Sequence, residues 1–185
     1  MLSFIAYAVI PVYTLMFVSG TNWFTSNLSV IGSWPGRRTA FFFLGILIGL
    51  YYLVVLKRLL SRIPRHSLET GILNTAFLLL LLAVLTPYLP DSVPLQAFLH
   101  VAFAFTASVL LAVCLCLILW RLSALSFSLR RALRPYRQAM AVILGVSMVL
   151  LFMVGIVSSS LEIFFIIATT ILVQRLYSRY GKGSL

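Results

Sequence analysis

The side chains in this chain of 185 residues that could act as acids, bases, thiol nucleophiles or metal ligands are His66, His100, Glu69, Asp91, Glu162, Cys114 and Cys116. A hydrolytic metal centre needs three or more such ligands to converge. The two histidines lie in different surroundings, because His66 follows a group of arginines and His100 lies in an apolar run. No phosphate-binding, dinucleotide-binding or zinc-protease motif accompanies them. We therefore predict no metal and no cofactor.

The segment NLSVIGSWPGRR, residues 27–38, is the longest polar stretch in the first half of the chain. Asn27 and Ser29 can form hydrogen bonds, and Arg37 and Arg38 can hold an anionic group. Pro35 and the neighbouring glycines permit tight turns. The segment is therefore a candidate binding site. The alternative is a connector whose two arginines extend to membrane phosphates.

Composition identifies the class of protein that must position these residues. Hydrophobic residues make up 62% of the chain and charged residues only 9%, whereas a soluble domain has roughly 25% charged residues. The chain is therefore predicted to be an integral membrane protein. Its net charge of +11 does not indicate nucleic-acid binding, because the basic residues lie at the ends of apolar segments, where they meet phospholipid headgroups.

Hydropathy predicts an all-α membrane protein with one domain over residues 1–185 and six transmembrane helices. Each span is close to the ~20 residues that a helix needs to cross the hydrocarbon of a bilayer. The apolar runs do not alternate with polar residues as the strands of a barrel wall do. The predicted spans are approximately 2–19, 39–60, 69–89, 95–120, 138–157 and 160–177.

The basic residues predict the orientation of these spans. All lysines and arginines except Arg37 and Arg38 lie in the last turns of the second or sixth span or in the segments that follow the second, fourth and sixth spans. Because loops rich in these residues stay in the cytoplasm, we expect both termini to be cytoplasmic. The segments 20–38, 87–94 and 157–160 are then outside.

In this topology His100 and Glu162 lie at similar depth, near the outer ends of the fourth and sixth spans. An ionisable residue within a span is a functional candidate by default. For His100 the alternative is a histidine whose hydrogen bonds are satisfied inside the bundle. For Glu162 the alternative is a carboxylate at a helix start, because the serines at 158–160 suit a helix N-cap.

Small residues predict close helix packing in two places. Residues four apart share one face of a helix, and small side chains let helices approach one another. Such a face occurs in the second span at Gly45 and Gly49. A longer one, with a histidine at its outer end, occurs in the fourth span at His100, Ala104, Ser108 and Ala112.

The layout resembles that of the Frag/DRAM/Sfk-type membrane proteins and their small bacterial relatives of unknown function. The features that carry the resemblance are Asn27, Ser29 and Gly32 followed by Pro35, the stretch Leu99-His100-Val101-Ala102, and the stretch Ser160-Leu161-Glu162-Ile163. Val30 departs from the acidic residue that members often carry in the first motif. The resemblance implies lipid-related biology. It does not imply the chemistry of ceramidase-like hydrolases, because the last spans lack their histidine pair.

The leading functional hypothesis is a non-enzymatic membrane protein that binds or senses lipid headgroups, or a segment of a membrane partner. The binding site would be an outer polar cluster of Asn27, Ser29, Arg37, Arg38, Asp91, His100 and Glu162. The expected partners are the phospholipid membrane and a lipid ligand or membrane protein, and the expected location is the cell membrane. Two alternatives are an enzyme acting on lipid headgroups, with His100 as base and Glu162 as its orienter, and a small transporter.

Two local structures are also predicted. The loop at 27–38 should fold back over the outer helix ends, with Asn27 and Ser29 pointing towards the fourth and sixth spans and with Ile31 and Trp34 in the membrane interface. The segment 121–138 has leucines at helical spacing followed by arginines. This pattern predicts a short helix on the inner membrane surface, and the alternative is a solvated basic connector.

Overall fold

The computed structural model describes residues 1–181, and these residues form helices joined by short turns, with no strand among them. The elements are α1 (Leu2–Phe4), the π-helical segment η1 (Ile5–Val9), α2 (Ile10–Phe17), α3 (Leu28–Ser33), α4 (Arg38–Leu60), α5 (Ser67–Leu85), α6 (Pro94–Leu125), α7 (Phe127–Ala132), α8 (Arg134–Val154) and α9 (Ser159–Tyr180). Five of them, α4, α5, α6, α8 and α9, are long and apolar enough to cross a membrane. The chain is an α-helical, multi-pass membrane protein.

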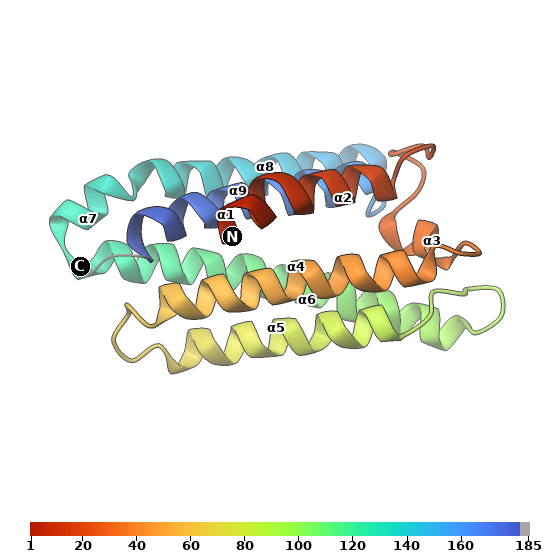
Figure 1. The fold of residues 1–185 in the computed structure, drawn as a ribbon, viewed down its shortest axis with the longest axis horizontal. Helices are drawn as coiled ribbons and strands as arrows, with labels where there is room; N and C mark the ends of the chain where they lie inside the picture. Colours follow the sequence, from red (N-terminus) through yellow and green to blue (C-terminus); the bar gives the residue numbers. More distant parts are fainter. Residues whose placement is uncertain (182–185) are drawn as a thin grey trace.

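The long helices run side by side as a bundle (Figure 1). In this view α4, α5 and α6 form one side of the bundle and α2, α8 and α9 form the other. Contacts between α4 and α9 and between α2 and α4 join the two sides. One end of the bundle carries α3 and the α5–α6 turn, and we call it the α3 end; the opposite end carries α7 and the α4–α5 turn, and we call it the α7 end.

The first apolar segment is shorter than the other long helices. It is helical from Leu2 to Phe17, which corresponds to about 24 Å at ~1.5 Å per residue. The π-helical segment ends at Val9, two residues before Pro11, and the amide of Ile10 donates to the carbonyl of Ile5. A proline has no N–H and crowds the preceding turn of a helix, so a wider turn at this place accommodates Pro11.

Prolines also explain where the helix boundaries differ from those predicted by hydropathy. Helix α5 ends at Leu85, before the predicted limit of 89, because Pro87 and Pro90 disfavour helical backbone before them. Helix α8 begins at Arg134, earlier than predicted, with a proline in its first turn, a position that suits proline.

The segment 121–138 is helical but is not one separate interfacial helix. Its first residues extend α6 to Leu125, the short α7 follows, and α8 starts at Arg134. Leu122 and Leu133 are buried in the bundle, whereas Leu125 is exposed. The predicted surface helix is therefore reduced to α7, because Leu122 before it and Leu133 after it belong to the hydrophobic core.

The predicted glycine packing in the second span is confirmed. A Cβ atom on Gly45 would lie 2.5 Å from Val84, and one on Gly49 would lie 3.0 Å from Phe77 and Leu80. These contacts join α4 to α5. The two helices can therefore lie this close only because both positions lack a side chain.

Candidate functional site

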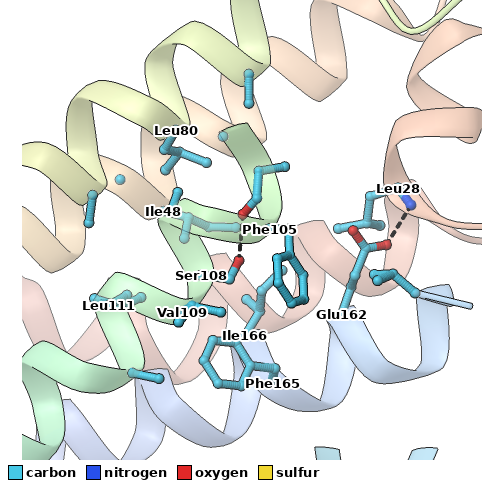
Figure 2. A pocket seen from close by; sticks show the side chains of 18 of the residues that line it. Leu28, Ile48, Leu80, Phe105, Ser108, Val109, Leu111, Glu162, Phe165 and Ile166 are labelled. Atoms are coloured by element: carbon cyan, nitrogen blue, oxygen red, sulfur yellow. Dashed lines mark hydrogen bonds between the residues drawn. The ribbon is translucent and has the colours of Figure 1, made fainter. Parts of the chain in front are cut away.

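A cavity of about 360 Å³ lies between the two sides of the bundle. Its wall is formed mainly by apolar side chains of α4, α5, α6, α8 and α9. Figure 2 shows the side chains of Phe105 of α6 and Phe165 of α9 among those that line it. Polar residues gather at the α3 end of the cavity, and they are Asn27, Ser29, His100 and Glu162. The cavity is thus mainly apolar, and four of its polar residues lie together at one end.

Helix α3 brings the first two of these residues to the cavity. The side chain of Asn27 caps the helix by accepting a hydrogen bond of 2.8 Å from the amide of Val30, as asparagine does at helix starts. Ile31 of the same helix is fully buried, whereas Trp34 is 41% exposed. The loop therefore folds over the helix ends as predicted, but the interfacial position predicted for Ile31 is wrong, because the helical turn directs Ile31 into the core.

His100 is buried, and both of its ring nitrogens are hydrogen bonded. Its Nδ1 lies 2.9 Å from the carbonyl oxygen of Thr86, and its Nε2 lies 2.6 Å from the hydroxyl oxygen of Ser29. A carbonyl can only accept, so the Nδ1 of a neutral imidazole carries the proton and the Nε2 accepts from Ser29. The rings of Phe41 and Tyr88 pack near the imidazole. These contacts fix the orientation of the ring.

Glu162 lies in the first turn of α9 and joins that helix to α3. Its carboxylate accepts a hydrogen bond of 2.7 Å from the amide of Leu28 (Figure 2). Nearby, the amides of Ser159 and Ser160 donate to the carbonyls of Ser26 and Trp23. The start of α9 and the chain leading into α3 are therefore fastened together.

The structure gives Glu162 a different contact from the one that the enzyme alternative predicted, in which it oriented His100. The group that orients the imidazole is the carbonyl of Thr86, whereas Glu162 holds the backbone of α3. Ser158 is the N-cap residue of α9, but its side chain does not cap the helix and pairs with the hydroxyl of Ser160. These partners could not be predicted from a sequence motif, because the carbonyl of Thr86 and the amide of Leu28 are backbone groups that nearly every residue type carries.

The three other predicted site residues lie away from this polar group. Arg37 donates to the carbonyl of Phe17 and so satisfies an orphan carbonyl at the end of α2. Arg38 and Asp91 are exposed. The predicted cluster of seven is thus divided into a cavity group of four residues and three residues that lie elsewhere.

The small-residue face of α6 has a different outcome from the glycine pair of α4. His100, Ala104, Ser108 and Ala112 all line the cavity, and the hydroxyl of Ser108 donates to the carbonyl of Ala104 within its own helix. This face of α6 therefore forms part of the cavity wall. Small side chains leave this space unfilled.

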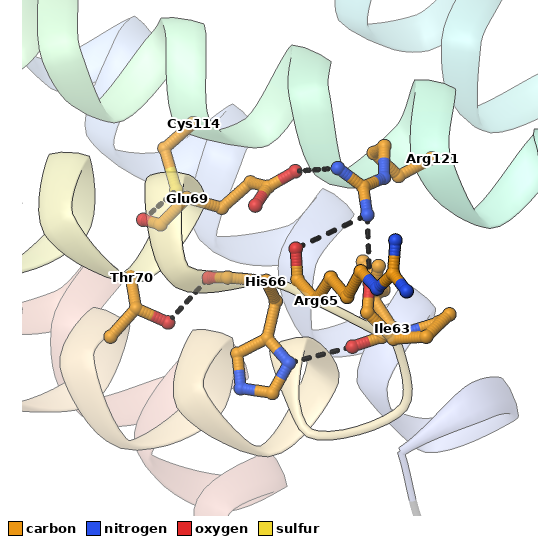
Figure 3. A network of polar contacts seen from close by, with 8 residues as sticks. Ile63, Arg65, His66, Glu69, Thr70, Cys114 and Arg121 are labelled. Atoms are coloured by element: carbon orange, nitrogen blue, oxygen red, sulfur yellow. Dashed lines mark hydrogen bonds and ion pairs between the residues drawn. The ribbon is translucent and has the colours of Figure 1, made fainter.

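An ion pair that the sequence analysis did not predict lies near the α7 end. Glu69 is 1% exposed, and its Oε1 accepts a hydrogen bond of 3.1 Å from Arg121. Arg121 also donates to the carbonyls of Pro64 and Arg65 (Figure 3). The sequence could have predicted this pair. Two spans joined by a short turn are antiparallel, so a residue at the start of the first span lies beside a residue at the end of the second.

A second unpredicted polar network joins α4 and α9 inside the bundle. The hydroxyl of Tyr52 lies within hydrogen-bond distance of the hydroxyls of Thr169 and Thr170. Tyr51 donates to the side chain of Gln174 at 3.1 Å. Tyr52 also lines the cavity. The helices are therefore joined by side-chain hydrogen bonds as well as by apolar packing.

The residues that the structure describes contain no group of three side chains able to hold a metal ion. Both cysteines have free thiols, with Cys114 buried and Cys116 exposed. No protein-family model matches the chain, and no curated protein or solved structure is significantly similar to it. The resemblance to the Frag/DRAM/Sfk-type proteins accordingly stays a prediction.

Proposed function

We propose that this membrane protein binds an amphiphilic lipid, with an acyl chain in the cavity and the polar part of the lipid beside Ser29, His100 and Glu162. The observation that carries the proposal is the division of one cavity into a long apolar part and a polar end. Ligand pockets commonly have volumes of about 300–1,000 Å³, a mainly apolar lining and a few polar groups that fix orientation. The cavity has these properties.

The exposure of the lining residues supports entry of a lipid from the side. Phe105 and Val109 of α6 and Met148 of α8 line the cavity and are also exposed on the surface of the bundle. In a bilayer this surface contacts acyl chains. A lipid can therefore pass between α6 and α8 without leaving the hydrocarbon region, which a site open only to water would not permit.

We further propose that the α3 end faces the outside of the cell membrane, with six spans and both termini in the cytoplasm. The basic residues of α7 and of the α4–α5 turn lie at the opposite end (Figure 1), as the preference of arginine and lysine for cytoplasmic loops requires. In this arrangement the short helix Leu2–Phe17 is the first span. The polar end of the cavity then lies in the outer leaflet, where lipid headgroups and ester groups are found.

Lipid retention tests the binding proposal. The protein is extracted in mild detergent, and native mass spectrometry measures the lipid that remains bound. Ala104→Phe places an aromatic ring in the cavity, because Ala104 lines it, and we expect this variant to lose the lipid. Thr106→Phe adds the same ring to an exposed position of the same helix, and we expect it to retain the lipid.

The result that would contradict the proposal is equal retention by both variants and the parent protein, or no retained lipid in any of them. A foreign membrane protein that co-purifies in place of a lipid would favour the partner-binding alternative. The proposed role agrees with the lipid-related biology that the resemblance to the Frag/DRAM/Sfk-type proteins implies.

A further inference from the structure

The contact between Ser29 and His100 has the geometry of a serine nucleophile and its general base. The distance of 2.6 Å between the Oγ and Nε2 atoms lies within the range of about 2.6–3.2 Å that such pairs show. A third group must hold the base in the correct tautomer, and the carbonyl of Thr86 does so at the Nδ1 atom. The lone pair of the Nε2 atom therefore faces the hydroxyl of Ser29.

The hydrogen bonds around Ser29 differ from those of a serine that only stabilises its own helix. Helix α3 is already capped by Asn27, so capping does not require the hydroxyl of Ser29. By contrast, Ser33 and Ser108 donate to carbonyls of their own helices. Ser29 and His100 both line the cavity. The hydroxyl is consequently placed where the polar end of a bound lipid would lie.

We propose that Ser29 and His100 hydrolyse an ester-linked acyl chain of a lipid held in the cavity. The inference rests on the proposed lipid-binding function and assigns a reaction to that site. It differs from the headgroup-directed enzyme that the sequence suggested, because the nucleophile is Ser29 and the bond attacked is the acyl ester. His100 and Ser29 are catalytic residues in this scheme, and the carbonyl of Thr86 is a positioning group.

The reaction proceeds in two balanced steps. In the first, the Oγ of Ser29 attacks the carbonyl carbon of the ester and its proton passes to the Nε2 of His100. The bond from that carbon to the alcohol oxygen then breaks, and the Nε2 returns the proton to the leaving alkoxide, so that a free alcohol and an acyl-serine form. In the second, water attacks the acyl group through the same base, and a carboxylic acid and the free serine result.

Developing charge on the ester oxygen needs a hydrogen-bond donor. Within the described part of the chain, the backbone amide of Ser29 has no acceptor, whereas the amides of Leu28 and Val30 on either side donate to Glu162 and Asn27. In serine hydrolases the amide of the nucleophile itself can serve as such a donor. Glu162 supports this arrangement by holding α3 in place.

A serine-directed fluorophosphonate with a long alkyl chain tests the pair in the full-length protein. The Oγ atom of an activated serine displaces fluoride and becomes covalently labelled, and peptide mass spectrometry locates the label. We expect the label on Ser29. It should be absent from Ser29→Ala and about 10²- to 10⁴-fold slower to form in His100→Gln, which lacks the base. It should be unchanged in Ser33→Ala, which removes the other serine of α3, a residue outside the cavity lining.

Hydrolysis of p-nitrophenyl myristate, p-nitrophenyl acetate and phosphatidylglycerol vesicles distinguishes the source of the acyl group. The apolar cavity predicts a preference for myristate over acetate, and release of fatty acid from the vesicles identifies membrane phospholipid as a substrate. Hydrolysis of myristate without release from vesicles assigns the activity to other long-chain esters and still supports the pair.

Control measurements keep folding and binding separate from chemistry. A variant carrying Cys116→Ser and Ser29→Cys places a thiol beside His100, and we expect iodoacetamide to modify the introduced thiol faster than when His100→Gln is added. If the parent protein retains lipid but Ser29 is not labelled and no ester is cleaved, the inference is overturned while the proposed function stands. If Ser29 is labelled but no lipid is retained, the binding proposal is overturned, while the proposed reactivity of Ser29 and His100 is supported.

Discussion

At the scale of single residues, backbone atoms supply the partners that give the polar side chains of the cavity their positions. His100 is oriented by the carbonyl of Thr86, and Glu162 accepts from the amide of Leu28. A burial pattern alone would place both residues inside the bundle but would not show which way their side chains point. The contact with Thr86 therefore fixes the imidazole with its Nε2 atom towards Ser29.

Replacement of Glu162 tests whether its hydrogen bond to Leu28 stabilises the contact between α9 and α3. Glu162→Leu removes the acceptor of the Leu28 amide, and a buried polar group left unpaired costs about 1–3 kcal/mol. We expect a lower midpoint of thermal unfolding in detergent. Glu162→Gln keeps an acceptor oxygen and should lose less stability. Equal losses in the two variants would show that the charge of Glu162, and not its hydrogen bond to Leu28, is what stabilises the fold.

The ion pair near the α7 end gives a second prediction at this scale. Arg121→Met leaves the buried carboxylate of Glu69 without its partner, and an uncompensated buried charge costs up to about 3–5 kcal/mol. The cost should be at the lower end of that range because the side chain of Arg121 is 31% exposed. Adding Glu69→Gln to Arg121→Met removes the charge, so the double variant should unfold at a higher temperature than Arg121→Met alone. Absence of this recovery would contradict the pairing.

At the scale of helices, small residues have opposite effects in α4 and α6. In α4 the glycines let α5 approach until a Cβ atom would clash, whereas in α6 the small residues line the cavity. The sequence pattern is the same in both helices. The difference arises from the neighbours, because the glycines of α4 pack against side chains of α5, whereas the small face of α6 lines the cavity together with residues of α8 and α9.

Alanine substitution at glycine separates packing from helix propensity. Gly45→Ala places a Cβ atom 2.5 Å from Val84, so we expect a clear loss of stability. Gly145 lies in α8 with open space around its missing Cβ, so Gly145→Ala should be neutral or stabilising by up to about 1 kcal/mol. Thermal unfolding of both variants in the same detergent provides the comparison. A similar response at both positions would mean that α4 and α5 are not packed closely at Gly45.

At the scale of the whole molecule, composition and hydropathy predicted the all-helical membrane class and the approximate positions of the apolar helices. The boundaries shifted where proline or a leucine-rich extension changed the local backbone, as at Leu85 and Leu125. The proximity of Ser29 to His100 was also predicted, because the loop had to cover helix ends at the depth of the histidine. The hydrogen bond between them confirms it.

Other features could not be predicted because they depend on three-dimensional neighbours. Ile31 suits either a membrane interface or a protein core, and only the turn of α3 decides that it is buried. The capping role of Arg37 depends on where the carbonyl of Phe17 lies. The cavity itself arises from the spacing of helices on opposite sides of the bundle, which hydropathy does not report.

The orientation of the bundle is tested by cysteine labelling in intact cells. In a Cys116→Ser background, Ser92→Cys in the α5–α6 turn should react with an impermeant maleimide. Ser128→Cys in α7 should react only after the membrane is permeabilised. Both positions are exposed in the structure, so burial does not prevent labelling. The reverse pattern would place the α7 end outside and contradict the proposed topology, although the cavity would be unchanged.

The most direct measurement of lipid binding in the cavity is a map of photocrosslinks from a phospholipid with a diazirine on its acyl chain. Crosslinking is performed in nanodiscs, and peptide mass spectrometry locates the products. We predict crosslinks concentrated on the cavity residues Ile48, Phe165 and Ile166, which are not exposed on the bundle surface, and reduced by Ala104→Phe. Crosslinks spread evenly over exposed outer positions such as Val142 and Phe152, with the cavity residues unlabelled, would contradict lipid binding in the cavity.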